Sequence, residues 1–168
     1  MKFAELGRYW ASKGYACVIQ DVRGKFSSEG EFDPMVHEAE DGFDTVEWIG
    51  CQPWCNGRVG MFGESYYGFT SLAAAVEQPS ALACIAPGDI ASDRHRIWFP
   101  QGAFLLNTVG AWAIAMDAPE YADLSRYSSW HTPLVDLAEP IGHAGRYFRT
   151  IVEHAYDRAW WAKRSVRD

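Results

Sequence analysis

The chain has 168 residues, of which 48% are hydrophobic and 22% charged, a balance that predicts a globular protein with a sizeable core and excludes a disordered chain. Its formal net charge of −7 disfavours binding to nucleic acid or to an anionic membrane. No stretch approaches the roughly 18 apolar residues of a membrane span, and the first residues contain no signal-peptide hydrophobic region. We therefore expect a cytoplasmic protein with no membrane partner.

Four cysteines are too few for a disulfide framework, so reduced thiols are expected. Cys51 and Cys55 are spaced one residue too far apart for a Cys-x-x-Cys motif, and no second ligand pair follows them. The sequence thus predicts no metal and no cofactor, with a thiol-redox module as a minor alternative.

The first two predicted elements are a short helix and a strand. Phe3, Leu6 and Trp10 recur at helical spacing, and Gly14 stands where a helix C-terminus is often capped. Residues 15–20 then form a nearly continuous apolar run, which is typical of a strand buried on both faces. The polar residues 21–30 are expected to form a loop.

A second helix is predicted to begin at Pro34, with Asp33 as its N-cap, because apolar side chains recur at helical spacing from Val36 to Ile49. The opposite face is acidic, and we interpret it as a solvated face rather than as a carboxylate site. Its residues are Glu38, Asp41, Asp44 and Glu47.

The next elements alternate between strand and helix. Residues 58–62 and 82–86 are short apolar runs that predict buried strands, and Phe69 to Val76 forms a helical stripe between them. This order predicts an α/β fold with a parallel sheet, whose ligands bind at the C-terminal ends of the strands.

From about Asp93 onward no run resembles a buried strand, while residues 104–116 and 147–161 have helical patterns. We therefore expect two regions, an α/β core segment at 1–93 and a helical segment at 94–168. Four aromatic residues of the second region either line an apolar pocket or fill its core: Trp98, Phe99, Phe104 and Trp112.

Residues 63–68, Gly-Glu-Ser-Tyr-Tyr-Gly, lie between a predicted strand and a predicted helix, as a nucleophile elbow does. Glycine two positions before the serine removes a Cβ that would collide with the neighbouring chain. In this interpretation Ser65 is exposed at the sheet edge, and the Tyr66 backbone N–H stabilises an oxyanion. A purely structural strand-to-helix turn is the alternative.

An ordered set of motifs from Tyr15 to Pro87 resembles the CocE/NonD hydrolases, the cocaine-esterase and Xaa-Pro dipeptidyl-peptidase-like members of the α/β-hydrolase fold. The matching runs are residues 20–24, 28–32, 40–45, 47–49 and 52–61, together with Gly63-x-Ser65-Tyr66-x-Gly68. The displaced glycine at position 68 is the family's own form, and residues 98–99 and 102–104 look like the opening of the family's helical cap.

The resemblance implies that Ser65 is an acyl-accepting nucleophile, that the Tyr66 N–H is an oxyanion donor, and that the substrate is a small-molecule ester or a short Xaa-Pro peptide. It also implies that the chain is a fragment, because the family places the triad Asp and His after the cap and a tyrosine-bearing oxyanion loop before residue 1. The alternative is a catalytically inactive remnant that acts as a binding or interaction module.

Residues within the chain are weak substitutes for the missing acid and base. Asp89 and Asp93 leave the strand that immediately follows the serine's strand, whereas the family's acid comes after the cap. The histidines lie on or between helical patterns rather than after a strand, which favours surface or capping roles for His37, His95, His131, His143 and His154.

Overall fold

The computed structural model describes residues 3–117, 130–141 and 145–166, and the chain divides into two units between Ser92 and Asp93. The first unit contains a parallel pair of strands, β1 (Val59–Glu64) and β2 (Leu82–Gly88). Both strands form where predicted, and each extends two residues beyond its expected end. They are not the buried strands expected, however, since Val59 is the only buried residue of β1 and β2 has none. Glu64 lies opposite Gly88, so both strands end at the same edge.

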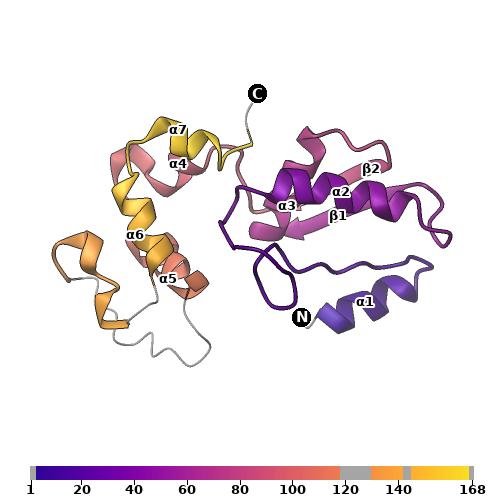
Figure 1. Cartoon of the computed structure of the whole chain (residues 1–168), viewed down its shortest axis with the longest axis horizontal. Helices are drawn as coiled ribbons and strands as arrows, with labels where there is room; N and C mark the ends of the chain where they lie inside the picture. The colour runs from indigo at the N-terminus through magenta and orange to yellow at the C-terminus, as the bar shows by residue number, and fades with distance from the viewer. Residues whose placement is uncertain (1–2, 118–129, 142–144, 167–168) are drawn as a thin grey trace. The chain divides into compact units, whose positions relative to one another are not determined.

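Two helices cover this sheet, and Figure 1 shows them beside the strands. The crossover helix α3 (Tyr66–Val76) packs on β1 and β2, and α2 (Glu38–Gly50) packs on α3. A Cβ added to Gly42 of α2 would lie 2.6 Å from the Cβ of Ala74, so a glycine lets the two helices approach closely. A buried cluster of Val46, Ile49, Val59 and Ala81 joins the helix layer to the strands. The chain has an α/β fold.

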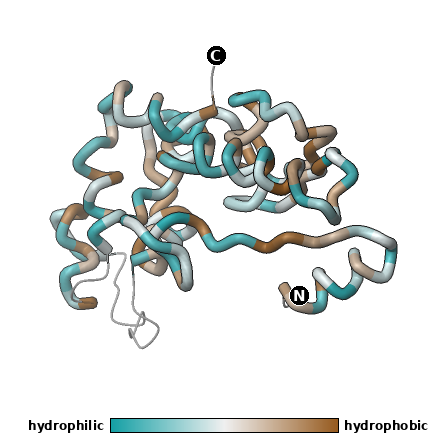
Figure 2. The backbone as a smooth tube through the Cα atoms, turned by 45° about the vertical axis from the view of Figure 1, so that its right-hand side comes forward, coloured by the Kyte–Doolittle hydropathy of each residue, from teal (hydrophilic) through white to brown (hydrophobic). Residues whose placement is uncertain are grey.

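The strand expected at residues 15–20 does not form. Helix α1 (Phe3–Ala11) is present as predicted, and Gly14 has a φ of +86° in the turn that follows it. The apolar run after it is extended, as Figure 2 shows, but Tyr15 and Ile19 are 64% and 49% exposed. A strand requires a neighbour that pairs with its backbone groups, and the sheet in the described residues contains only β1 and β2.

Helix α2 begins later than predicted, at Glu38 instead of Pro34. Met35 has a φ of +64°, which is incompatible with a continuous helix, and His37 is the N-cap. The interpretation of the acidic face as solvated is wrong for Glu38, which is only 7% exposed and bonds to the Tyr66 hydroxyl and the Met35 N–H.

The second unit is helical in its described residues, as expected. Its α-helices are α4 (Arg94–Trp98), α5 (Ala111–Asp117), α6 (Arg146–Glu153) and α7 (Arg158–Ala162). Short helical turns occupy η1 (Pro100–Gly102), η2 (Leu106–Gly110), η4 (Leu134–Asp136) and η5 (Glu139–Ile141). The helix predicted over 147–161 is divided in two, because Asp157 caps a new helix by accepting hydrogen bonds from the N–H groups of Ala159 and Trp160.

The aromatic residues at the start of this unit belong to its core. Trp98 and Phe99 are 6% and 7% exposed, and their rings lie 5.6 and 5.7 Å from the ring of Trp161. Phe104 stacks beside Phe99 and Trp112 beside Trp98, which extends the same cluster. Of the two interpretations of these aromatics, core packing therefore describes Trp98 and Phe99. Among the described residues, no helix is long and apolar enough to cross a membrane.

Candidate active site

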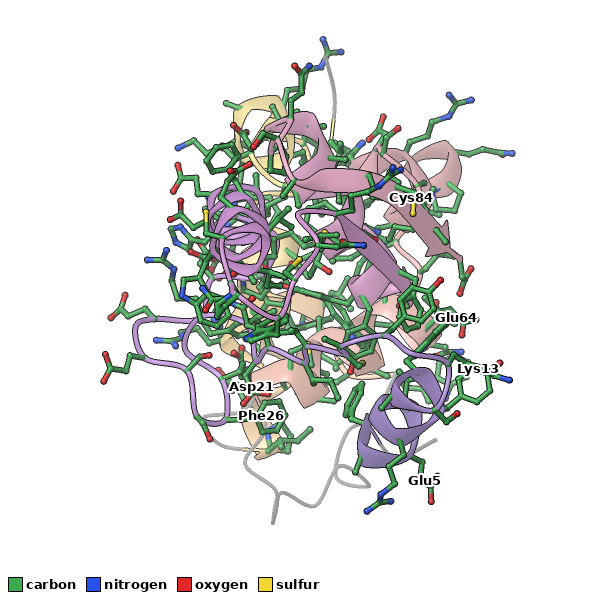
Figure 3. The ribbon with its side chains drawn as sticks, turned by 90° about the vertical axis from the view of Figure 1, so that its right-hand side faces the viewer. Glu5, Lys13, Asp21, Phe26, Glu64 and Cys84 are labelled. Carbon is green, nitrogen blue, oxygen red and sulfur yellow. The ribbon has the colours of Figure 1, made fainter. Side chains whose placement is uncertain are left out.

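Ser65 occupies the turn between β1 and α3. Glu64, labelled in Figure 3, is the last residue of the strand, and Tyr66 is the first residue of the helix. Ser65 has a φ of 58° and a ψ of −123°, a conformation that a residue with a side chain rarely adopts and that costs of order 1–3 kcal/mol. Its N–H donates to the Gly88 carbonyl at 2.9 Å, and its carbonyl accepts from the Phe69 N–H at 3.0 Å. The backbone is thus fixed on both sides while the side chain is exposed.

Two glycines make this turn possible. A Cβ on Gly63 would lie 2.4 Å from the Cβ of Tyr67, so the collision expected there is with the first turn of α3 rather than with an adjacent strand. A Cβ on Gly68 would lie 2.8 Å from the carbonyl oxygen of Gly88 and 3.0 Å from that of Gly63. The spacing Gly-x-Ser-x-x-Gly therefore follows from how closely α3 approaches the ends of both strands.

Tyr66 places its backbone N–H next to the serine at the start of an 11-residue helix. The first N–H groups of a helix lie outside its ladder of i→i−4 hydrogen bonds and form the positive end of the helix dipole. A developing negative charge beside Ser65 would be stabilised there.

A buried carboxyl lies next to this turn. Glu38 Oε1 accepts hydrogen bonds from the Tyr66 hydroxyl and, at 3.2 Å, from the Met35 N–H. The Met35 N–H also donates to the Tyr66 hydroxyl oxygen at 3.0 Å, which closes a triangle of three groups. Burial raises the pKa of the Glu38 carboxyl above its ordinary value, and the hydrogen bonds from Tyr66 and Met35 offset part of that rise.

Sequence reasoning missed Glu38 because it treated the acidic residues of α2 as one solvated face. The available signal was position, since a carboxylate in the first turn of a helix lies near N–H groups that can bond it. Two other acidic residues of that face, Asp41 and Glu47, bond to neighbouring segments. Asp41 pairs with Arg23 of the loop that carries Asp21 and Phe26 (Figure 3), and Glu47 accepts from the Ser80 N–H.

The histidines bond away from the serine. The His95 ring lies 2.8 Å from the Ala155 carbonyl, and the His154 ring lies 2.9 Å from the Thr150 carbonyl. His37 occupies the N-cap position of α2 without a capping hydrogen bond from its side chain, and His131 is half-buried. His143 lies outside the described residues.

The two aspartates that follow β2, Asp89 and Asp93, make no hydrogen bond to Ser65 in the described residues. Asp93 caps α4, and Asp89 is exposed in the turn after β2 with a φ of 47°. Within residues 3–117, 130–141 and 145–166, no imidazole or carboxylate hydrogen-bonds to Ser65 Oγ. In the described part of the chain, Ser65 Oγ therefore has no hydrogen bond to a residue that could serve as the acid or base of a triad.

Metal-ligating side chains do not cluster near this turn. All four cysteines are free thiols, and Cys51 and Cys84 are exposed. Among the described residues, no three His, Cys, Asp or Glu side chains gather into a group that could hold a metal ion. The start of α3 brings together the Tyr66 hydroxyl and the Glu38 carboxyl, and Ser65 directly precedes Tyr66.

Solved structures with a similar backbone are larger hydrolases and peptidases. A CocE/NonD family hydrolase from Staphylococcus aureus has a TM-score of 0.64 and 23% identity, over 86% of this chain and 23% of its own. An aminopeptidase from a marine sediment archaeon, Thaumarchaeota archaeon, has a TM-score of 0.63 and 23% identity, over 87% of this chain and 28% of its own. At this identity the likeness shows the fold alone.

Sequence comparisons identify the family. Cocaine esterase from Rhodococcus sp. is 48% identical over 102 residues, which are 60% of this chain and 18% of that protein. This chain therefore spans about a fifth of the length of that relative. The family described as X-Pro dipeptidyl-peptidase (S15 family) matches residues 2–168. The resemblance to CocE/NonD hydrolases is confirmed, and the chain belongs to the X-Pro dipeptidyl-peptidase (S15) family of hydrolases.

Proposed function

We propose that this chain carries the nucleophile segment of a serine hydrolase that cleaves carboxylic esters, or Xaa-Pro peptides as the second substrate class, through an acyl-enzyme on Ser65. The observation that carries the proposal is the exposed Ser65 at a φ of 58° between β1 and α3, enclosed by two glycines that accept no Cβ. A structural turn alone would not need this strained residue to be an exposed serine. The 48% identity to a cocaine esterase favours the ester over the peptide.

The reaction follows from the position of Ser65. Its Oγ attacks the substrate carbonyl carbon while a histidine takes the hydroxyl proton, and the carbonyl oxygen becomes negatively charged. The Tyr66 N–H at the start of α3 donates a hydrogen bond to that oxygen. The tetrahedral intermediate then expels the alcohol or amine, which receives the proton. Water attacks the acyl-enzyme in the same way, releases the acid and restores the serine.

The triad Asp and His are proposed to lie beyond this chain. Two observations support this, namely the 18% share of the cocaine esterase that the chain spans and the lack of a hydrogen bond between Ser65 Oγ and any imidazole in the described residues. Loss of the base costs on the order of 10⁶ in turnover in a serine protease. The 168 residues alone are therefore expected to be nearly inert.

We further propose that residues 1–93 are part of the α/β-hydrolase core and that residues 94–168 are part of its helical cap. The two units of the chain divide between Ser92 and Asp93, and the strands lie only in the first of them within the described residues. The substrate is then a small-molecule ester or a short peptide. The sequence and fold suggest neither a nucleic-acid partner nor a bound cofactor.

Turnover measurements on the protein at its full encoded length test this function. A p-nitrophenyl ester and an Xaa-Pro p-nitroanilide report the two substrate classes, and we expect faster turnover of the ester. Ser65→Ala is expected to abolish both activities, while Ser12→Ala, at an exposed serine after α1, is expected to leave them unchanged. Turnover that persists in Ser65→Ala would overturn the assignment. A full-length protein that turns over neither substrate would favour a non-catalytic binding module.

A further inference from the structure

The carboxyl of Glu38 is buried. Its burial carries a desolvation cost that an apolar side chain at the same position would not have. Glu38 is 7% exposed, and its second oxygen, Oε2, is buried and has no hydrogen-bond partner within the described residues. Burial of a carboxyl is unfavourable unless hydrogen bonds compensate for it. The hydrogen bonds from other residues, the Tyr66 hydroxyl and the Met35 N–H, reach this carboxyl through Oε1.

These bonds connect three parts of the first unit. Met35 belongs to the turn before α2, Glu38 to the first turn of α2, and Tyr66 to the first residue of α3. The Tyr66 hydroxyl both donates to Glu38 and accepts from the Met35 N–H, so its ring is held at its far end. The ring also packs edge-on against Phe69, one turn along α3, at a centroid distance of 6.2 Å.

We propose that Glu38 is a positioning residue for the reaction at Ser65, because it holds the Tyr66 side chain and thereby fixes the residue whose backbone N–H faces the developing oxyanion. The inference rests on the proposed nucleophilic role of Ser65. Glu38 acts through Tyr66, since no hydrogen bond joins its carboxyl to Ser65 in the described residues.

The expected size of the effect follows from how steeply catalysis depends on geometry. Misplacement of a catalytic group by about 1 Å can cost on the order of 100-fold in rate. Loss of the Tyr66 tether leaves Ser65 fixed by Gly88 and Phe69, so only part of that displacement is expected. We therefore expect kcat to fall about 10-fold, with KM nearly unchanged because the proposed effect is on the group that stabilises the oxyanion and not on substrate binding.

Four variants of the full-length enzyme test this role. Tyr66→Phe removes the hydroxyl, Glu38→Leu removes the acceptor, and Glu38→Gln keeps an acceptor oxygen on a side chain of the same length. Tyr67→Phe is the matched control, because Tyr67 is the next residue, is 56% exposed, and makes no hydrogen bond through its hydroxyl in the described residues. Each kcat for the p-nitrophenyl ester is divided by the fraction of serine that a fluorophosphonate titrates, so that unfolded protein does not count.

We expect kcat per titrated serine to fall about 10-fold in Tyr66→Phe and Glu38→Leu and to stay near the wild-type value in Glu38→Gln and Tyr67→Phe. An unchanged kcat per titrated serine in Tyr66→Phe would overturn the inference, even if thermal stability fell. It would show that the hydrogen bond between Tyr66 and Glu38 contributes to stability alone. Tyr66→Phe decides the question if Glu38→Leu does not fold. If Ser65→Ala turned over the ester as fast as the wild-type enzyme, that result would overturn the proposed function, and the inference with it.

Discussion

Gly68→Ala tests directly whether the spacing of the elbow motif is set by backbone packing. The added Cβ would lie 2.8 Å from the Gly88 carbonyl oxygen and 3.0 Å from the Gly63 carbonyl oxygen. Both neighbours are backbone atoms at the ends of β2 and β1, and a backbone cannot rotate away as a flexible side chain can. Helix α3 must therefore move outward from the edge of the sheet.

The magnitude is a balance of two effects. Overpacking of this kind costs about 1–3 kcal/mol. Replacement of glycine by alanine inside a helix returns up to about 1 kcal/mol. Because both contacts are with backbone atoms, the upper part of that cost, about 2–3 kcal/mol, applies here. After the gain of about 1 kcal/mol, the net loss of local stability is about 1–2 kcal/mol, which corresponds to amide exchange about 5–30-fold faster in α3.

Hydrogen exchange followed by mass spectrometry measures this change on peptides from α3 in the full-length protein. Gly7→Ala is the matched control, because Gly7 lies in α1 and its added Cβ would meet only the Ile19 Cδ1 at 3.9 Å. We expect exchange in α1 to slow in that variant, since alanine favours the helix there. Unchanged or slower exchange of α3 in Gly68→Ala would refute the packing argument.

Three further outcomes are expected. The raised pKa of Glu38 means that the folded state holds its proton more tightly, so the stability that this group contributes is complete below its ordinary pKa of about 4.3 and is lost as pH rises toward the folded value. Glu38→Gln should remove that slope in denaturation measured across pH, and a slope that is unaltered in this variant would contradict the reasoning. Glu47→Ala should cost about 1–2 kcal/mol by thermal denaturation, because the carboxylate binds the Ser80 N–H and hydroxyl, and Glu47→Gln should recover part of this loss. Asp157→Ala should destabilise α7 by about 1 kcal/mol, and Asp157→Ser should restore it; equal exchange rates in all three proteins would exclude a cap.

The segment from β1 to β2 could be predicted from sequence because its signals are local. Apolar runs at 58–62 and 82–86 and a helical stripe between them reproduce the observed strand, helix and strand to within a few residues. The Gly-x-Ser-x-x-Gly pattern likewise places Ser65 at the observed strand-to-helix turn. Each of these features depends on neighbours within about twenty residues along the chain.

The errors have non-local causes. Residues 15–20 have the composition of a buried strand, but a strand depends on a pairing partner that no local pattern reveals. The start of α2 depends on the left-handed backbone of Met35, a conformation that its sequence neighbours do not indicate. For Glu38, position in the first turn of α2 was the local signal, but its hydrogen-bond partner Tyr66 follows 28 residues later.

The central claim, that Ser65 is the acyl-accepting nucleophile, is tested most directly by the site of a covalent adduct. The full-length protein is reacted with a fluorophosphonate, digested, and sequenced by tandem mass spectrometry. We expect one phosphonyl group on Ser65, in the peptide that spans β1 and α3, and no adduct in Ser65→Ala. An adduct on another residue, or one that forms equally in Ser65→Ala, would contradict the account.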